Sequence, residues 1–241
     1  MRKVLLVGVS FFALGLGNAI AEDVTVNDSS TGSVNDITQA ATGTGAMVTV
    51  DQSGIGTGAP GTTTAVPADT NVLIDQATDD DSMISVTQAG VSSIFVDQDA
   101  VGGASTVTAS QLGDLNQAEI TQMAADATID LLQNGDGNIA TATQTMDENI
   151  ADIGQWGMTN TATVNQNGLG NNADVDQGAD GAPMDGNIAT VTQDGMESFV
   201  VVSQLGAGNT ATATQNSGVV DGAMITINQD GSGGTTTVVQ N

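Results

Sequence analysis

Small or apolar residues alternate with polar ones in short stretches that recur along most of the chain. Residues 209–215 read N-T-A-T-A-T-Q, residues 198–204 read S-F-V-V-V-S-Q, and residues 160–166 read N-T-A-T-V-N-Q. A two-residue alternation is typical of a β-strand that turns one set of side chains toward a core. The pattern therefore predicts many short strands.

Each stretch closes on a glutamine, and these glutamines recur at a fixed interval. The interval is eleven within three groups, which are Gln111, Gln122, Gln133, Gln144, Gln155, Gln166, Gln177; Gln193, Gln204, Gln215; and Gln229, Gln240. Upstream the repeat is looser, at Gln39, Gln52, Gln76, Gln88 and Gln98, and Gln117 falls outside it. A glycine often follows two residues later, where the chain can turn with φ > 0; these turn glycines include Gly113, Gly135, Gly157, Gly168, Gly195, Gly206 and Gly231. We expect about 17 units, each a seven-residue strand and a four-residue turn.

Acidic residues identify the buried face. The chain has 28 of them, yet the first, third, fifth and seventh positions of the units contain none. Acids lie at even strand positions, such as Asp130, Asp152 and Asp174, or in turns, such as Asp114 and Asp136. Burying a carboxylate without a partner cation is costly. The odd positions are therefore predicted to face inward.

Side-chain volume at the first and third positions is compensated. Units that open with Asn have Ala third, as in Asn160/Ala162, whereas units that open with Ser, Thr or Ala have a β-branched residue third, as in Ser198/Val200. Only the units that open at Ser33 and Gly234 depart from this rule. A narrow, close-packed interior requires such compensation of side-chain volume.

Buried amides need hydrogen-bond partners. Coils stacked about 4.8 Å apart supply them, because each inward amide can bond to the amide of the next coil and so form a ladder. The candidate ladder residues are Ser105, Gln111, Asn116, Gln122, Gln133, Asn138, Gln144, Asn149, Gln155, Asn160, Gln166, Asn171, Gln177, Asn187, Gln193, Ser198, Gln204, Asn209, Gln215, Gln229 and Gln240.

The predicted fold is thus an all-β solenoid with two short strands per coil and about eight coils, spanning residues 33–241. Irregular segments are expected at 53–69, which contains Pro60 and Pro67 and forms either a degenerate strand at 62–66 or a loop, and at 178–186. Residues 22–32 form a polar segment without the repeat. The first and last coils would expose unpaired backbone groups, since neither terminus offers a convincing cap.

Residues 1–21 are predicted to be a secretory signal peptide. Arg2 and Lys3 precede an apolar run of about 13 residues, shorter than the roughly 20 of a membrane span, and an A-x-A site predicts cleavage between Ala21 and Glu22. Every acid lies at or beyond Glu22 and both cations lie before it, so cleavage leaves a side-chain charge of −28. Nucleic-acid binding, which depends on Lys and Arg, is excluded, and membrane insertion after cleavage is not expected.

Composition also narrows the chemistry. The chain has no His, Cys or Tyr, which excludes a Ser-His-Asp triad, a Cys-His pair, a His-ligated metal and a disulfide. With no acid inside and no cleft expected, we predict that the protein is not an enzyme, has no catalytic or metal-binding residues and uses no cofactor.

The repeat resembles the curlin repeat of bacterial curli fibres. Two segments carry the full S-x5-Q-x-G-x2-N-x-A-x3-Q spacing, from Ser105 to Gln122 and from Ser198 to Gln215, and partial matches extend over most of residues 33–241. The resemblance implies a secreted subunit of extracellular, pilus-like amyloid in the biofilm matrix of a Gram-negative-type bacterium, active in adhesion and aggregation. It also implies self-assembly, an outer-membrane export pore, related subunits as partners, and inward Ser, Asn and Gln as amyloid-forming positions. The number of units, the scarcity of aromatics and the frequent Asn or Ala opening depart from the family pattern, which leaves major and nucleating subunit unresolved.

Other interpretations remain open. The chain could be a soluble acidic surface adhesin. Outward threonines, such as Thr210, Thr212 and Thr214, could form an ice-binding array, although Asp152, Asp174 and Gln117 interrupt the outward rows and Thr is in any case favoured on exposed strands. Turn acids, such as those at 79–81, could ligate Ca²⁺, but solubility and assembly delayed by charge repulsion are the preferred explanation, because the chain contains no G-G-x-G-x-D-x-U-x unit.

Overall fold

The computed structural model describes residues 23–28, 34–39, 47–53, 71–76, 82–99, 103–178, 185–216 and 222–241. They form two sheets that we call the odd sheet and the even sheet. The strands of the odd sheet, in spatial order, are β1 (Asp23–Asp28), β3 (Met47–Ser53), β5 (Met83–Ala89), β7 (Thr106–Leu112), β9 (Thr128–Asn134), β11 (Ile150–Trp156), β13 (Asn172–Gln177), β15 (Phe199–Leu205) and β17 (Met224–Asp230). Those of the even sheet are β2 (Val34–Gln39), β4 (Asn71–Gln76), β6 (Ser93–Gln98), β8 (Gln117–Gln122), β10 (Ile139–Gln144), β12 (Thr161–Gln166), β14 (Ile188–Gln193), β16 (Thr210–Gln215) and β18 (Thr235–Gln240).

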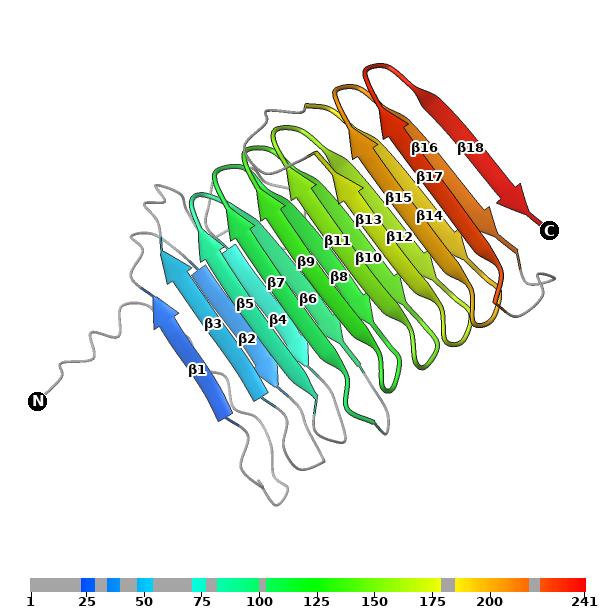
Figure 1. Ribbon diagram of the computed structural model, residues 1–241. Helices are drawn as coiled ribbons and strands as arrows, with labels where there is room; N and C mark the ends of the chain where they lie inside the picture. Colours follow the sequence, from blue (N-terminus) through cyan, green and yellow to red (C-terminus); the bar gives the residue numbers. More distant parts are fainter. Residues whose placement is uncertain are drawn as a thin grey trace, which may run out of the picture.

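The chain winds as a β-solenoid with two strands per coil, as the eleven-residue repeat predicts. It runs along one strand of the odd sheet, turns, and returns along the next strand of the even sheet, so each sheet is parallel within itself (Figure 1). Each glutamine aligns with the glutamine of the next coil, for example Gln133 with Gln155 and Gln144 with Gln166. The first strand, β1, and the last, β18, therefore lie at opposite ends of the stack (Figure 1).

A thin two-layer core fills the space between the sheets. The third and fifth positions supply its aliphatic part, which includes Ile84, Val107, Ile129, Leu131 and Ile153, and these side chains are essentially inaccessible to solvent. Successive side chains of a strand point to opposite faces of the sheet, so every second residue enters the core. In β12, for example, half-buried and buried residues alternate along the strand. Asn160 and Ala162 are both fully buried, consistent with the volume compensation in the sequence.

The structure contains one strand that the repeat did not predict. β1 lies within the segment 22–32, which was expected to be non-repetitive, and pairs in parallel with β3. By register Asp28 aligns with Gln52, so this strand places an acid where the others have glutamine. Because β1 lacks the terminal glutamine, a search based on that residue could not find it.

The sheets are continuous on both sides of the first irregular segment. β2 pairs directly with β4, and β3 pairs directly with β5. A possible strand at 62–66, most of the segment 178–186, and the signal peptide predicted for residues 1–21, with its cleavage site, lie outside the described residues.

Glycine is required in the turns chiefly because successive turns stack directly on each other. A Cβ on Gly135, whose φ is +125°, would lie 1.9 Å from the carbonyl oxygen of Gly157 in the next coil. The expectation of positive φ is wrong for Gly168 and Gly195, which are outside the left-handed region. At Gly168 close stacking is the reason for glycine, since a Cβ would lie 1.7 Å from the oxygen of Gly195.

Candidate functional site

Two continuous ladders of glutamine amides run through the interior of the solenoid. In each ladder the Nε2 of one glutamine donates to the Oε1 of the glutamine in the next coil toward the C-terminus, at 2.6–3.0 Å. The even-sheet ladder comprises Gln76, Gln98, Gln122, Gln144, Gln166, Gln193, Gln215 and Gln240, and the odd-sheet ladder comprises Gln88, Gln111, Gln133, Gln155, Gln177, Gln204 and Gln229. All are buried except Gln240, in the last coil.

A second hydrogen bond fixes the orientation of most of these amides. The other Nε2 hydrogen of Gln155 goes to the carbonyl oxygen of Ile139 at 3.0 Å, and that of Gln177 goes to the carbonyl oxygen of Thr161 at 2.9 Å. These acceptors lie on the first residue of a strand in the opposite sheet, so the ladder also ties the two sheets together. Because a carbonyl only accepts, the nitrogen must be the atom that faces it.

The asparagines form a second set of ladders at the corners where strands begin. Asn138 illustrates the arrangement, since its Oδ1 accepts from the backbone N–H of Asn160 and its Nδ2 donates to the carbonyl of Gly157. The remaining inward corner residues Asn116, Asn149, Asn171, Asn187, Asn209, Ser105 and Ser198 are also buried and hydrogen-bonded. The structure thus brings together every ladder residue that the sequence predicted.

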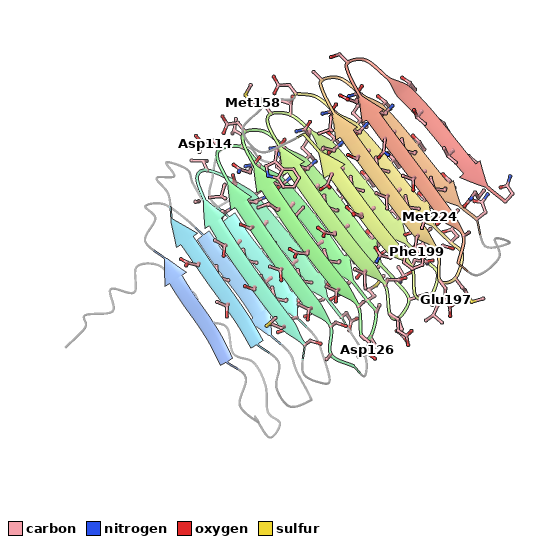
Figure 2. The ribbon with its side chains drawn as sticks, in the orientation of Figure 1. Asp114, Asp126, Met158, Glu197, Phe199 and Met224 are labelled. Carbon is pink, nitrogen blue, oxygen red and sulfur yellow. The ribbon has the colours of Figure 1, made fainter. Side chains whose placement is uncertain are left out.

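Turn aspartates have a role that the sequence pattern did not indicate. The Oδ1 of Asp114 accepts a hydrogen bond from the backbone N–H of Val91. In the same way, the Oδ1 of Asp136 accepts from the backbone N–H of Asp114, and the Oδ1 of Asp147 accepts from the backbone N–H of Ala125, all at 2.9–3.0 Å. Each bond joins one coil to the next. Figure 2 shows Asp114 and Asp126 on opposite rims of the stack. These carboxylates therefore act as lateral clamps between turns, in addition to carrying charge.

The outward surfaces of the two sheets differ in charge. On β9, β11 and β13 the aspartates at the fourth unit position align with one another, so Asp130, Asp152 and Asp174 form a column of like charges, with Asp176 nearby. On β10, β12, β14, β16 and β18 the outward residues carry no charge. From β9 onward the outward acids of the strands therefore lie on the odd sheet. The even sheet carries its outward acids nearer the N-terminus, where Asp75 of β4 aligns with Asp97 of β6 and Glu119 lies on β8.

Partial burial raises the pKa of Asp152, and the charges of Asp130, Asp174 and Asp176 raise it further. Burial also raises the pKa of Asp174 and of Asp176. A carboxyl whose pKa is higher in the folded than in the unfolded state destabilises the fold when ionised. This destabilisation of the folded state is complete at neutral pH and declines as pH falls through the raised pKa values. It disappears below pH 3.8, the ordinary pKa of the carboxyl in the unfolded chain.

We expect Asp152→Asn to stabilise the folded chain at pH 7 by roughly 1 kcal/mol, because it removes two like-charge contacts with facing residues. At pH 3 the gain should vanish, since Asp152 is then protonated. Urea denaturation at both pH values measures the change. Glu119→Gln is the matched control, because Glu119 faces only Phe95 and Thr141 in its column. An equal gain from both variants at pH 7 would contradict the prediction.

The outer edges of the last two strands have no partner strand within the described residues. Thr210 N–H donates to the Gly234 carbonyl, and Phe199 N–H donates to the Ala223 carbonyl. Because parallel pairing alternates between residues, the N–H groups of Thr235, Thr237 and Val239 in β18 point away from β16. Those of Met224, Thr226 and Asn228 in β17 point away from β15 in the same way.

In the part of the chain that the structure describes, no group of three or more His, Cys, Asp or Glu residues could hold a metal ion. The acids at 79–81 fall outside that part.

Among the described residues no helix is long and apolar enough to cross a membrane. Trp156 is the last residue of β11, and its ring lies over Gly154, where a Cβ would be 2.5 Å from the ring.

No family model, curated protein or solved structure matches this chain.

Proposed function

We propose that this chain is a secreted structural subunit that assembles end to end into extracellular, curli-like amyloid fibres. The observation that carries the proposal is the pair of open parallel edges at β17 and β18. They continue the sheets in which β1 and β2 are the opposite terminal strands. A second copy can therefore extend both sheets in the same direction and the same order.

Such a contact joins different surfaces of identical molecules. It is heterologous, and contacts of this kind generate open filaments when rotation does not close a ring. Unpaired strand edges also favour addition of further strands, and soluble proteins usually cover them. Strands perpendicular to the growth axis with the ordinary interstrand spacing are the geometry of cross-β fibres.

The chemistry of assembly is backbone pairing continued by amide ladders. The ladder extends to the last coil, where Gln215 Nε2 donates to Gln240 Oε1 at 3.0 Å. Gln240 Nε2 donates to the carbonyl of Met224 at 3.2 Å and is partly exposed. An incoming copy adds the next rung to a ladder that already exists. No catalysis, cofactor or metal is needed, and the partners are other copies, related subunits and an outer-membrane export pore.

The direct test is to incubate the purified chain and examine it for thioflavin-positive filaments. We expect filaments with a meridional reflection at about 4.8 Å, and faster growth at pH 4 than at pH 7 because protonation removes repulsion between carboxylates. A chain that stays monomeric at both pH values, even with sonicated fibre seeds, would instead indicate a soluble acidic adhesin.

A further inference from the structure

We propose that the outer face of the even sheet from β10 to β18 binds the surface of ice crystals. We call this surface the threonine face. The inference goes beyond the fibre role, because it concerns a lateral face and a different partner.

Threonine dominates this face and is rare on the opposite one. Eleven of the fifteen outward positions on β10, β12, β14, β16 and β18 are threonine. The corresponding positions on β9, β11, β13, β15 and β17 contain two threonines and four aspartates. A general preference of threonine for exposed strands would enrich both sheets alike, so it does not explain the difference.

The threonines lie in register. The central column is Thr141, Thr163, Thr190, Thr212 and Thr237, each directly opposite the next. A second column contains Thr143, Thr192 and Thr214, and a third contains Thr161, Thr210 and Thr235. The resulting grid has a repeat of about 4.8 Å across the strands and about 6.6 Å along them. These repeats are of the size of the spacings between water oxygens on the faces of ice.

The grid is also rigid. Threonine is restricted at χ1, so hydroxyl and methyl groups keep fixed directions on a strand. The threonine side chains from β10 to β16 are half-buried among their neighbours. Behind them the glutamine ladder joins these strands, for example from Gln166 to Gln193 at 3.0 Å. A preorganised surface loses little entropy when it binds, so many weak contacts to an ordered lattice can add up.

Charge separates the two faces. Ionised carboxylates hold their own hydration shells and would disturb a water lattice, and the threonine face has none. Asp152 and Asp174, which were expected to interrupt the outward threonine rows, lie on the odd sheet instead, because consecutive units belong to opposite sheets. Gln117 does lie on the even sheet, on β8 together with Glu119, and these two residues border the threonine face on its N-terminal side.

The test compares Thr190→Lys with Val201→Lys. Both residues occupy the fourth unit position, Thr190 on β14 in the centre of the threonine face and Val201 on β15 in the odd sheet. Freshly purified chain, shown to be monomeric by sedimentation, is partitioned between growing ice and liquid, and thermal hysteresis and crystal shape are recorded. We expect the unmodified chain to enter and shape ice, and Thr190→Lys to lower its affinity about tenfold, a loss of about 1.4 kcal/mol.

Val201→Lys should leave ice binding unchanged, and circular dichroism melts should show that both variants fold. No ice shaping by the unmodified chain would overturn the inference, as would equal losses in the two variants. A chain that sediments as a dimer, with Thr190→Lys a monomer and neither entering ice, would assign the face to a second copy instead. Because the assay uses monomer, failure to form fibres has no bearing on its result.

Discussion

A chain carrying Thr226→Pro and Thr237→Pro should fold but should not extend filaments. Proline has no backbone N–H, and in a sheet it is tolerated where the missing donor would face away from the neighbouring strand. Both residues are at such positions, because their N–H groups point away from β15 and β16. β17 and β18 are the last strands of the two sheets (Figure 1). We expect growth from preformed seeds, followed by thioflavin fluorescence, to fall to the level of a seed-free sample.

The control for this prediction is the double variant Thr226→Val with Thr237→Val, which keeps both N–H groups. It should elongate seeds at the rate of the unmodified chain. Thermal unfolding of the proline variant should remain cooperative, because the intramolecular ladder to β15 and β16 is intact. Normal elongation by the proline variant would show that the fibre does not grow through these edges.

Replacing Gln204 and Gln215 by alanine should have the largest effect on stability and should slow fibre formation. Gln204 accepts from Gln177 and donates to Gln229 and to the carbonyl of Ile188, at 2.8–3.0 Å. Alanine at this position removes one hydrogen-bond partner from Gln177 Nε2, Gln229 Oε1 and the Ile188 carbonyl oxygen. Each lost bond destabilises the fold by about 1–3 kcal/mol, and the missing side chain also leaves a cavity. We expect each substitution to cost at least about 4 kcal/mol, measured by urea denaturation.

Thr210→Ala and Thr212→Ala provide the comparison, because both side chains face outward on β16. Surface substitutions of this kind usually change stability by no more than about 0.5 kcal/mol. Fibre growth should therefore be nearly unchanged. Equal effects of the glutamine and threonine substitutions would mean that the amide ladders are not the structural core.

The inward face was predictable because three independent patterns coincide on it. Glutamine spacing, exclusion of acids and compensation between Asn160 and Ala162 all follow from one narrow interior, and the structure confirms that these residues are buried. The all-β solenoid is confirmed with them. None of the three patterns depends on which sheet a strand joins, so a single eleven-residue period was enough to identify the inward positions.

The outward surfaces were not predictable from that period. Residues that face the same solvent-exposed surface recur every two units, so Thr141 aligns with Thr163 and Asp130 with Asp152. Reading all units as one series mixed the two faces and concealed the threonine columns. β1 was missed because it ends in Asp28, and the turn clamps were missed because an aspartate that bonds the preceding coil has no distinctive spacing.

The direction of the amide ladders gives the solenoid a chemical polarity. In every described glutamine pair the donor belongs to the earlier coil and the acceptor to the later one, as from Gln193 to Gln215. The amide dipoles in each ladder therefore point the same way along the axis and reinforce one another. A fibre built by repeating this unit has a plus and a minus extremity, and the rates of subunit capture at the two are expected to differ.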